Sequence, residues 1–247
     1  MYVTKRRSMT VAAAAAIALG GSSVAVVQTA VAHGPETGVA TASPNPAPDA
    51  VEDPRGEAEM PQRIAPINYE YAQALMQLPT EELEPTFMGQ IVAHHAAVLE
   101  MAQVAMEEAD HPVLRSLAGT IINAQQHQIQ QFTQMLEQEY GLTPEKAREQ
   151  APGEIPQILE GVNELLAQKV ATIREASESP EFDRIWLSEV VPHHQTAILQ
   201  FQAVQAGTDD PQLLLMANMG IGGQEMQIVQ MLNWLIQWYG AEDHAVQ

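Results

Sequence analysis

The sequence contains no cysteine. A chain without thiols forms neither disulfide bonds nor iron–sulfur clusters, and it has no thiolate to act as a nucleophile or a zinc ligand. Any bound metal ion must therefore be held by histidine, methionine, carboxylate or amide groups. Aromatic residues make up only 5% of the 247 residues, whereas alanine, glutamine, leucine, methionine and glutamate are abundant, which favours helices over strands. The length fits one compact helical domain.

Basic residues are also scarce, because 11 Lys and Arg stand against 31 Asp and Glu, which gives a formal net charge of −20. Affinity for nucleic acids comes from Lys and Arg side chains that neutralise phosphates, and the few basic residues of this chain do not cluster. The same argument applies to an electrostatic anchor on anionic lipids. We therefore exclude nucleic acid as a partner.

Residues 1–32 have the pattern of an export signal. Lys5, Arg6 and Arg7 precede the apolar or small run VAAAAAIALGGSSVAVVQTAVA, whose last residues are the small-x-small pattern that a signal peptidase recognises. A retained membrane anchor is the alternative, since about 20 apolar residues span a bilayer, but glycine, serine and other polar residues interrupt this run. We expect a cleaved signal peptide, no stable membrane insertion after cleavage, and a protein exported to the periplasm, the cell envelope or the extracellular space.

Residues 33–65 contain six prolines and no apolar period. Such a segment cannot bury enough apolar surface to offset the entropy lost on ordering, so we predict a flexible linker rich in proline and alanine. The folded domain is expected over residues 66–241.

An internal repeat organises the rest of the chain, because a shift of 99 residues aligns two His-His pairs without a gap. The matched positions include His94 with His193, His95 with His194, Asp110 with Asp209, Pro112 with Pro211, Gln128 with Gln227 and Tyr140 with Tyr239. The copies, over residues 80–141 and 179–240, each read as two helices with proline or aspartate at the starts and glycine at the end. A helix near residues 154–177 joins the copies, and a shorter one near 67–78 precedes them. Two hairpins joined by a long crossover predict an all-α four-helix bundle.

Helical periodicity indicates which residues face the bundle interior. One stripe of the first copy runs Phe87, Ile91, His94, Val98, Met101 and Ala105, at alternating steps of four and three. Its equivalent in the second copy runs Trp186, Val190, His193, Ala197, Gln200 and Val204. The partner helices place Gln125, Gln128, Gln224 and Gln227 on their inner stripes. These buried polar groups must pair with each other, with water or with a ligand, because an unpaired one costs about 1 to 3 kcal/mol.

Two interpretations of this polar layer stay open. The repeat brings two His-His pairs toward one centre, which is how bundles assemble metal sites from facing helices. Alternatively, His94 and His193 each donate a ring N–H to a Gln carbonyl and accept from a Gln amide, so that the layer only fixes the register of the helices. His95 and His194 lie one position round the helix, where they either turn inward as additional ligands or lie at a helix interface. His111 and His127 are expected to be solvated or peripheral.

The segments FMGQIVAHHAAVLEMA and LAGTIINAQQHQIQQF, with their echoes WLSEVVPHHQTAILQF and MANMGIGGQEMQIVQML, resemble the exported family called domain of unknown function 305. The family pattern is a Phe seven residues before an HH pair, a Met-Ala shortly after it, and a Gln-x-x-Glu-Ile-x-x-Met stretch on the next helix. The resemblance covers about residues 80 to 240. It implies a ferritin-like four-helix fold, and some members of the family are associated with binding copper or silver in the cell envelope through His and Met.

The resemblance also implies a set of ligands for copper, as Cu(I) or Cu(II), or for silver. That set is His94, His95, Met101, His193, His194 and Met231, with Gln125, Gln128, Gln224 and Gln227 as the polar groups around it. This chain departs from the family where Ile91 and Val190 replace a Met before the HH pair, and where Gln128 and Gln227 replace a Glu. We therefore expect a lower metal capacity than in a relative rich in methionine.

The ligand types separate the possible metals and functions. Di-iron sites of ferritin-like bundles need several Glu side chains, and the inner positions here carry Gln, which argues against an iron oxidase. No nucleophile–base pair, phosphate loop or metalloprotease signature is present in the sequence, and Gly220, Gly222 and Gly223 suggest close helix packing instead of a binding loop. The sequence predicts a non-enzymatic, exported protein that binds copper or silver for storage, buffering or tolerance. The alternative is a non-catalytic structural or interaction bundle, acting as a homo-oligomer or with an unknown protein partner.

Overall fold

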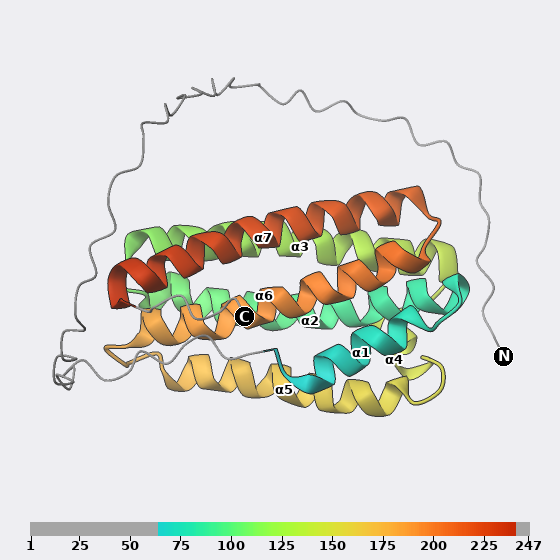
Figure 1. Ribbon diagram of the computed structural model, residues 1–247, viewed down its shortest axis with the longest axis horizontal. Helices are drawn as coiled ribbons and strands as arrows, with labels where there is room; N and C mark the ends of the chain where they lie inside the picture. The colour runs from blue at the N-terminus through green and yellow to red at the C-terminus, as the bar shows by residue number, and fades with distance from the viewer. Residues whose placement is uncertain (1–63, 241–247) are drawn as a thin grey trace, which may run out of the picture. The chain divides into compact units, whose positions relative to one another are not determined.

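The computed structural model describes residues 64–240, which contain helices and no β-strand (Figure 1). The elements are α1 (Pro66–Met76), α2 (Thr80–Glu108), α3 (Pro112–Met135), the π-helical turn η1 (Leu136–Tyr140), α4 (Pro144–Glu149), α5 (Ile155–Glu175), α6 (Phe182–Gly207) and α7 (Pro211–Tyr239). The predicted signal peptide and nearly all of the predicted linker lie outside the described residues. None of the helices described is long and apolar enough to cross a lipid bilayer.

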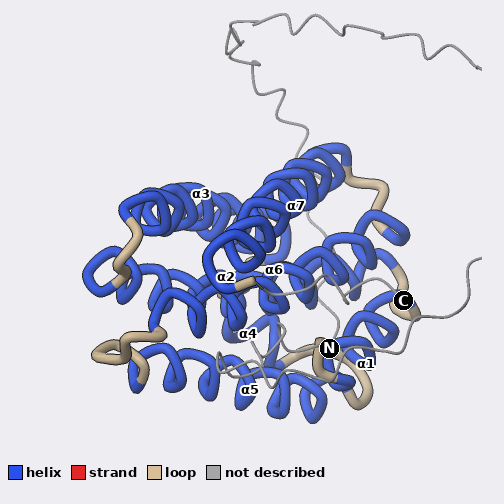
Figure 2. Tube along the Cα trace, turned by 60° about the vertical axis from the view of Figure 1, so that its left-hand side comes forward, coloured by secondary structure: helices blue, strands red, loops and turns tan. Residues whose placement is uncertain are grey.

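The helices lie in three layers (Figures 1 and 2). The middle layer consists of α2 and α6, which pack against each other. The hairpin partners α3 and α7 cover one face of this layer, and α5 covers the other face together with the short helices α1 and α4. The predicted all-α fold of two repeated hairpins joined by a crossover helix is confirmed, and α2 and α6 have both faces covered.

Most helix ends follow the sequence signals. Gly141 and Gly240 adopt positive φ angles of 68° and 66° after the second helix of each copy, a conformation that glycine adopts without strain. Asp210 begins α7 by accepting hydrogen bonds from the backbone N–H groups of Gln212 and Leu213, at 2.8 and 3.0 Å. The short helix α4 was not predicted, because six residues are too few to show a helical period.

The two predicted inner stripes on α2 and α6 are buried along their whole length, with exposed fractions of 0 or 1%. Phe87 and Phe201 pack on each other with ring centroids 5.5 Å apart, and Phe132 of α3 lies 5.7 Å from Phe87. The indole N–H of Trp186 donates to the backbone oxygen of Met101 at 2.9 Å, which satisfies the one polar atom of this large side chain. The core therefore extends along the α2–α6 interface on which the histidines also lie.

Each hairpin also reaches across to the other one through a buried acid. Asp183 at the start of α6 is 3% exposed and accepts from the backbone N–H groups of Asp110 and His111, at 3.0 and 2.9 Å, just before α3. Its repeat equivalent, Glu84 of α2, accepts hydrogen bonds from the hydroxyl groups of Tyr140 and Thr208. The carboxylate of Asp183 lies at the start of α3, where the helix dipole stabilises its charge. The hydrogen bonds of Asp183 with residues 110 and 111, and of Glu84 with Thr208, join the two hairpins.

His111, which the sequence analysis places at the periphery, takes part in this contact. Its side chain is 39% exposed, yet its Nδ1 lies 2.6 Å from Asp183 and its ring stacks on Trp238 at 3.7 Å. His127 is exposed, as predicted.

Only one of the three glycines expected to pack closely does so. A Cβ added at Gly220 would lie 2.6 Å from the ring of Phe201, whereas one added at Gly222 or Gly223 would meet nothing within 4 Å. We expect Gly220→Ala to lower the free energy of unfolding by about 1 to 3 kcal/mol, because the buried ring of Phe201 has no room to move. Gly222→Ala is the control and is expected to raise it by about 0.5 to 1 kcal/mol through helix propensity. Urea unfolding of both variants tests this, and equal shifts would contradict the packing argument.

Candidate metal centre

His94 of α2 and His193 of α6 meet at the centre of the middle layer. Each side chain is 1% exposed, and the two imidazole rings stack with their centroids 3.8 Å apart and 24° between their planes. All four ring nitrogens of this pair are buried, and none has a hydrogen-bond partner among the described residues. Native structures rarely leave buried polar atoms unpaired, so this pair requires a physical explanation.

Both rings are held in the neutral form. Desolvation by burial lowers the pKa of His94 and of His193 well below the usual value of 6.5, and neighbouring imidazoles and Lys169 lower both further. A neutral imidazole has one ring nitrogen with a free lone pair, which is the form that binds metal ions. The pair therefore presents bare nitrogen donors at physiological pH.

His95 and His194 are fully buried beside the stacked pair and contact the partner helices. Nε2 of His95 lies 2.8 Å from Oε1 of Gln128 on α3, and Nε2 of His194 lies 2.7 Å from Oε1 of Gln227 on α7. An amide oxygen only accepts, so Nε2 of His95 donates its N–H, and Nδ1 of this ring is left as an acceptor without a partner. Such a contact is the usual way in which proteins orient a metal-binding imidazole.

Burial also keeps these two outer rings neutral. Desolvation lowers the pKa of His95 to about 3, although the hydrogen bond with Gln128 acts in the opposite direction. Desolvation likewise lowers the pKa of His194 to about 4 against the effects of Gln227 and the Val190 backbone. All four imidazoles are therefore uncharged at neutral pH.

Neighbouring rings connect His95, His94, His193 and His194 in that order at the α2–α6 interface, and this set is called the row below. Ring centroids are 6.1 Å apart from His95 to His94, 3.8 Å from His94 to His193, and 6.1 Å from His193 to His194. Within residues 64–240, however, no three His, Asp or Glu side chains are arranged to hold one metal ion. The stacking explains this, because nitrogens in the planes of facing rings do not point to one shared centre. The stacked rings of His94 and His193 must rotate before both can coordinate the same ion.

The predicted glutamines divide into two kinds. Gln128 and Gln227 pair with the outer imidazoles, as described above. Gln125 and Gln224 are 3% and 4% exposed, and Oε1 of the first and both amide atoms of the second have no partner among the described residues. Gln200 of α6 is fully buried with both amide atoms unpaired. The alternative in which His94 and His193 pair with glutamines is therefore not what the structure shows, whereas His95 and His194 contact Gln128 and Gln227 on the partner helices.

The repeated HH pairs lie on facing helices and are flanked by glutamines. A family profile for this pattern matches residues 84–244. The chain belongs to the DUF305 family, a domain of unknown function. A search among curated proteins found no significant match.

Solved structures of CopM resemble this DUF305 chain. CopM in the Cu(II)-bound form is 23% identical, with a TM-score of 0.51 over 63% of this chain and 97% of that one. CopM in the Cu(I)-bound form is 25% identical, with a TM-score of 0.51 over 64% and 98%. CopM in an Ag-bound form obtained by co-crystallization is 24% identical, with a TM-score of 0.52 over 64% and 98%. These likenesses support the helical fold.

The ligand set that the DUF305 resemblance implies also contains two methionines. Met101 is fully buried and stands seven residues after His94 on α2, about 10 Å along the helix axis. Met231 of α7 is also fully buried, and its repeat equivalent, Phe132, has its ring centroid 6.4 Å from that of His95. Both methionine side chains belong to the hydrophobic core.

Sequence reasoning missed an ion pair beside the imidazoles of this DUF305 protein. The ammonium group of Lys169 on α5 pairs with the carboxylate of Glu189 on α6, and the side chains are 12% and 9% exposed. Glu189 stands four residues before His193, on the same side of α6, so the helical period provided a signal. Its repeat equivalent is Gln90, which donates to Oδ1 of Asn163 on α5 at 3.1 Å. Polar groups of α5 thus meet both copies of the repeat.

We expect Lys169→Met to lower the free energy of unfolding by about 3 kcal/mol, because it leaves the Glu189 carboxylate buried without its cation. The double variant Lys169→Met/Glu189→Gln should recover most of this loss. Arg174→Met is the matched control, since the Arg174–Glu100 pair is 62% and 47% exposed and such pairs contribute about 1 kcal/mol or less. Urea unfolding measures all three, and a similar loss at Lys169 and Arg174 would contradict the buried role.

Proposed function

We propose that this protein binds copper or silver ions through the row of four imidazoles between α2 and α6, and that it serves metal storage, buffering or tolerance outside the cytoplasm. The observation that carries the proposal is the pair His94 and His193, whose four ring nitrogens are buried and unpaired. A ligand that uses these nitrogens removes the energetic penalty of leaving them unpaired.

The chemistry of the donors selects the metal class. Neutral imidazoles without carboxylates suit Cu(I), Ag(I), Cu(II) or Zn(II) better than hard cations such as Mg²⁺ or Ca²⁺. CopM, which resembles this chain in fold, has been solved in Cu(I)-, Cu(II)- and Ag-bound forms. Copper and silver are therefore the metals to test first, with zinc as the comparison.

Calorimetric titration of the protein with Cu(I), Ag(I), Cu(II) and Zn(II) tests the proposal. We expect tight, stoichiometric binding of Cu(I) or Ag(I) that is lost in His94→Ala/His193→Ala. Met226→Ala is the control, since Met226 is exposed on α7, does not line a groove beside the imidazoles, and its loss should leave binding unchanged. Equal weak uptake by all three proteins would exclude a specific site at the stacked pair.

A structural bundle remains the second candidate function, and the outer histidines favour it. The contacts of His95 with Gln128 and of His194 with Gln227 join the two helices of each hairpin and so fix their register. If the outer histidines only fix this register, His95→Ala/His194→Ala will unfold at a lower urea concentration. In that case, adding a metal ion will not raise the stability of the unmodified protein. A metal-dependent rise in the stability of the unmodified protein would favour the first proposal.

A further inference from the structure

A groove of about 750 Å³ runs along the outer layer between α3 and α7. Its lining is rich in amides and thioethers, from Asn123, Gln125, Gln128, Gln131, Gln224, Gln227, Met216 and Met219 among others, and it includes the exposed imidazole of His127. No Asp, Glu, Lys or Arg lines it, in a chain where 17% of residues are charged. The groove is thus a neutral surface that offers amide oxygens and sulfur atoms.

The groove meets both ends of the row of imidazoles. Gln128 and Gln227 line it, and the same two side chains contact the outer rings of His95 and His194 at 2.8 and 2.7 Å. From these outer rings, the row continues inward to the stacked pair. The imidazoles are at most 1% exposed, so a metal ion reaches them only when side chains that cover them move. On the side of the groove, Gln128 and Gln227 are such side chains.

Two further glutamines in the groove carry unused polar atoms. Gln125 and Gln224 line the groove, are more than nine-tenths buried, and keep Oε1 of the first and both amide atoms of the second without a partner among the described residues. Amide oxygens are hard donors that bind the soft ions Cu(I) and Ag(I) only weakly, so such an ion can stay briefly and move on. The unpaired oxygens therefore suit a passage for cations.

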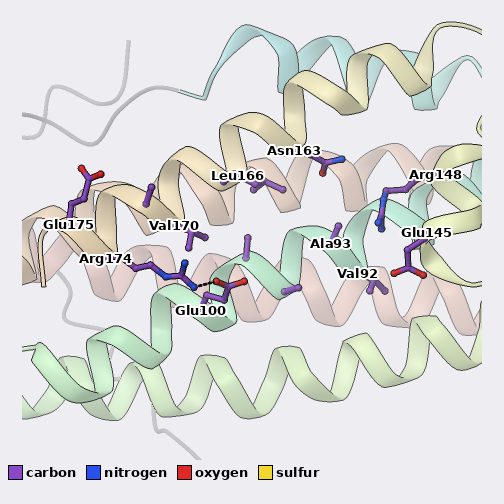
Figure 3. Close-up of a pocket in the computed structure, with 14 residues that line it drawn as sticks. Val92, Ala93, Glu100, Glu145, Arg148, Asn163, Leu166, Val170, Arg174 and Glu175 are labelled. Atoms are coloured by element: carbon purple, nitrogen blue, oxygen red, sulfur yellow. Dashed lines mark hydrogen bonds and ion pairs between the residues drawn. The ribbon is translucent and has the colours of Figure 1, made fainter.

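The opposite face of the middle layer carries charges of both signs, unlike the α3–α7 groove, which no Asp, Glu, Lys or Arg lines. There Lys169 of α5 pairs with Glu189 of α6. A second groove, of about 680 Å³ between α2 and α5, is lined by Arg148 and Arg174 together with Glu100, Glu145 and Glu175 (Figure 3). Arg174 is paired with Glu100 in it, and Arg148 donates to the backbone oxygen of Gly89.

We propose that the metal ion reaches the buried imidazoles through the α3–α7 groove, with the amides of Gln125 and Gln224 as its first contacts and Gln128 and Gln227 as the side chains that must move aside. This inference rests on the proposed metal binding. It concerns the rate of uptake, whereas the proposed function concerns affinity and stoichiometry, so separate measurements test the two.

Two glycines of α7 provide a matched pair of variants. Gly222 and Gly223 both have open space where a Cβ would stand, but only Gly223 lines the groove. Gly223→Phe is expected to fill part of the groove and to slow the association of Ag(I) at least 10-fold, with unchanged stoichiometry. Gly222→Phe should change the rate less than 2-fold. Stopped-flow tryptophan fluorescence in nitrate buffer measures the rates, and competition with a chelator measures the end point.

Two exposed methionines of α7 provide a second pair, which does not depend on a bulky side chain. Met219 is 66% exposed and lines the groove, whereas Met226 is 72% exposed and does not line it. Met219→Lys places a positive charge at the groove and should slow Ag(I) association about 10-fold at low ionic strength, with the effect lost in 1 M sodium nitrate. Met226→Lys carries the same charge and should have a much smaller effect.

The outcomes separate the two proposals. Slower uptake by Gly223→Phe and Met219→Lys, with normal uptake by their controls, supports the groove as the route. Stoichiometric binding at equal rates in all five proteins overturns the route and leaves the metal site in place. Absence of stoichiometric binding by the unmodified protein overturns both.

Discussion

Lowering the pH from 7 to 5.5 should destabilise the metal-free protein by about 5 kcal/mol, a large part of the stability of an ordinary domain. The cause is the row of four neutral imidazoles. In the unfolded chain each of them takes up a proton near pH 6.5, whereas burial lowers the pKa of His95 to about 3, that of His194 to about 4, and those of His94 and His193 well below 6.5.

The sign follows from proton binding. Below pH 6.5 the unfolded state binds more protons than the folded state, so stability is fully present above pH 6.5 and is lost as the pH falls toward the folded-state pKa values. Each histidine contributes up to about 1.4 kcal/mol per pH unit in this window. Carboxylates titrate mainly below it, so the loss between pH 7 and 5.5 is specific to histidine.

Urea unfolding at intervals from pH 8 to 5 measures the effect. His94→Leu/His193→Leu should lose about half of the dependence on pH, because two of the four titrating rings are gone. Met226→Ala should keep it in full, since Met226 is exposed and carries no titrating group. A stability that stays flat between pH 7 and 5.5 would show that the imidazoles are not held neutral by burial.

Much of the fold could be predicted because the 99-residue repeat and the helical period act on many residues at once. The stripes of α2 and α6 and the glycine ends at Gly141 and Gly240 are set by local signals of this kind. The helix α4 is too short to show a helical period. The helical period places Glu189 on the same side of α6 as His193, but that Lys169 is its partner depends on how α5 packs, which a local pattern does not give.

The candidate site was predictable by residue but not by arrangement. The period placed His94 and His193 on the inner stripe, and both are buried. It could not decide whether His95 and His194 turn inward, because one helical step leaves a residue near the edge of the stripe; the structure shows them paired with Gln128 and Gln227. The stacking of the inner rings and the groove between α3 and α7 follow from the distances between helices, which periodicity does not give.

Replacing the stacked pair should separate metal binding from folding. We expect His94→Leu/His193→Leu to raise the free energy of unfolding of the metal-free protein at pH 7 by about 2 kcal/mol or more. Its four unpaired buried nitrogens disappear, and leucine occupies a similar space without needing hydrogen bonds. Saturating Cu(I) or Ag(I), at about 1,000 times the dissociation constant, should stabilise the unmodified protein by about 4 kcal/mol and leave the variant unchanged.

The outer pair is the matched control for this experiment. His95→Leu/His194→Leu removes the same number of imidazoles but also the hydrogen bonds with Gln128 and Gln227, so it should lower the metal-free stability by about 1 kcal/mol for each hydrogen bond. Opposite signs for the two double variants would mean that the outer histidines stabilise the fold while the inner ones are retained at a cost in stability. A function that compensates for that cost must use their ring nitrogens. Equal losses in both variants would instead show that all four histidines serve packing, and the metal proposal would lose the observation that carries it.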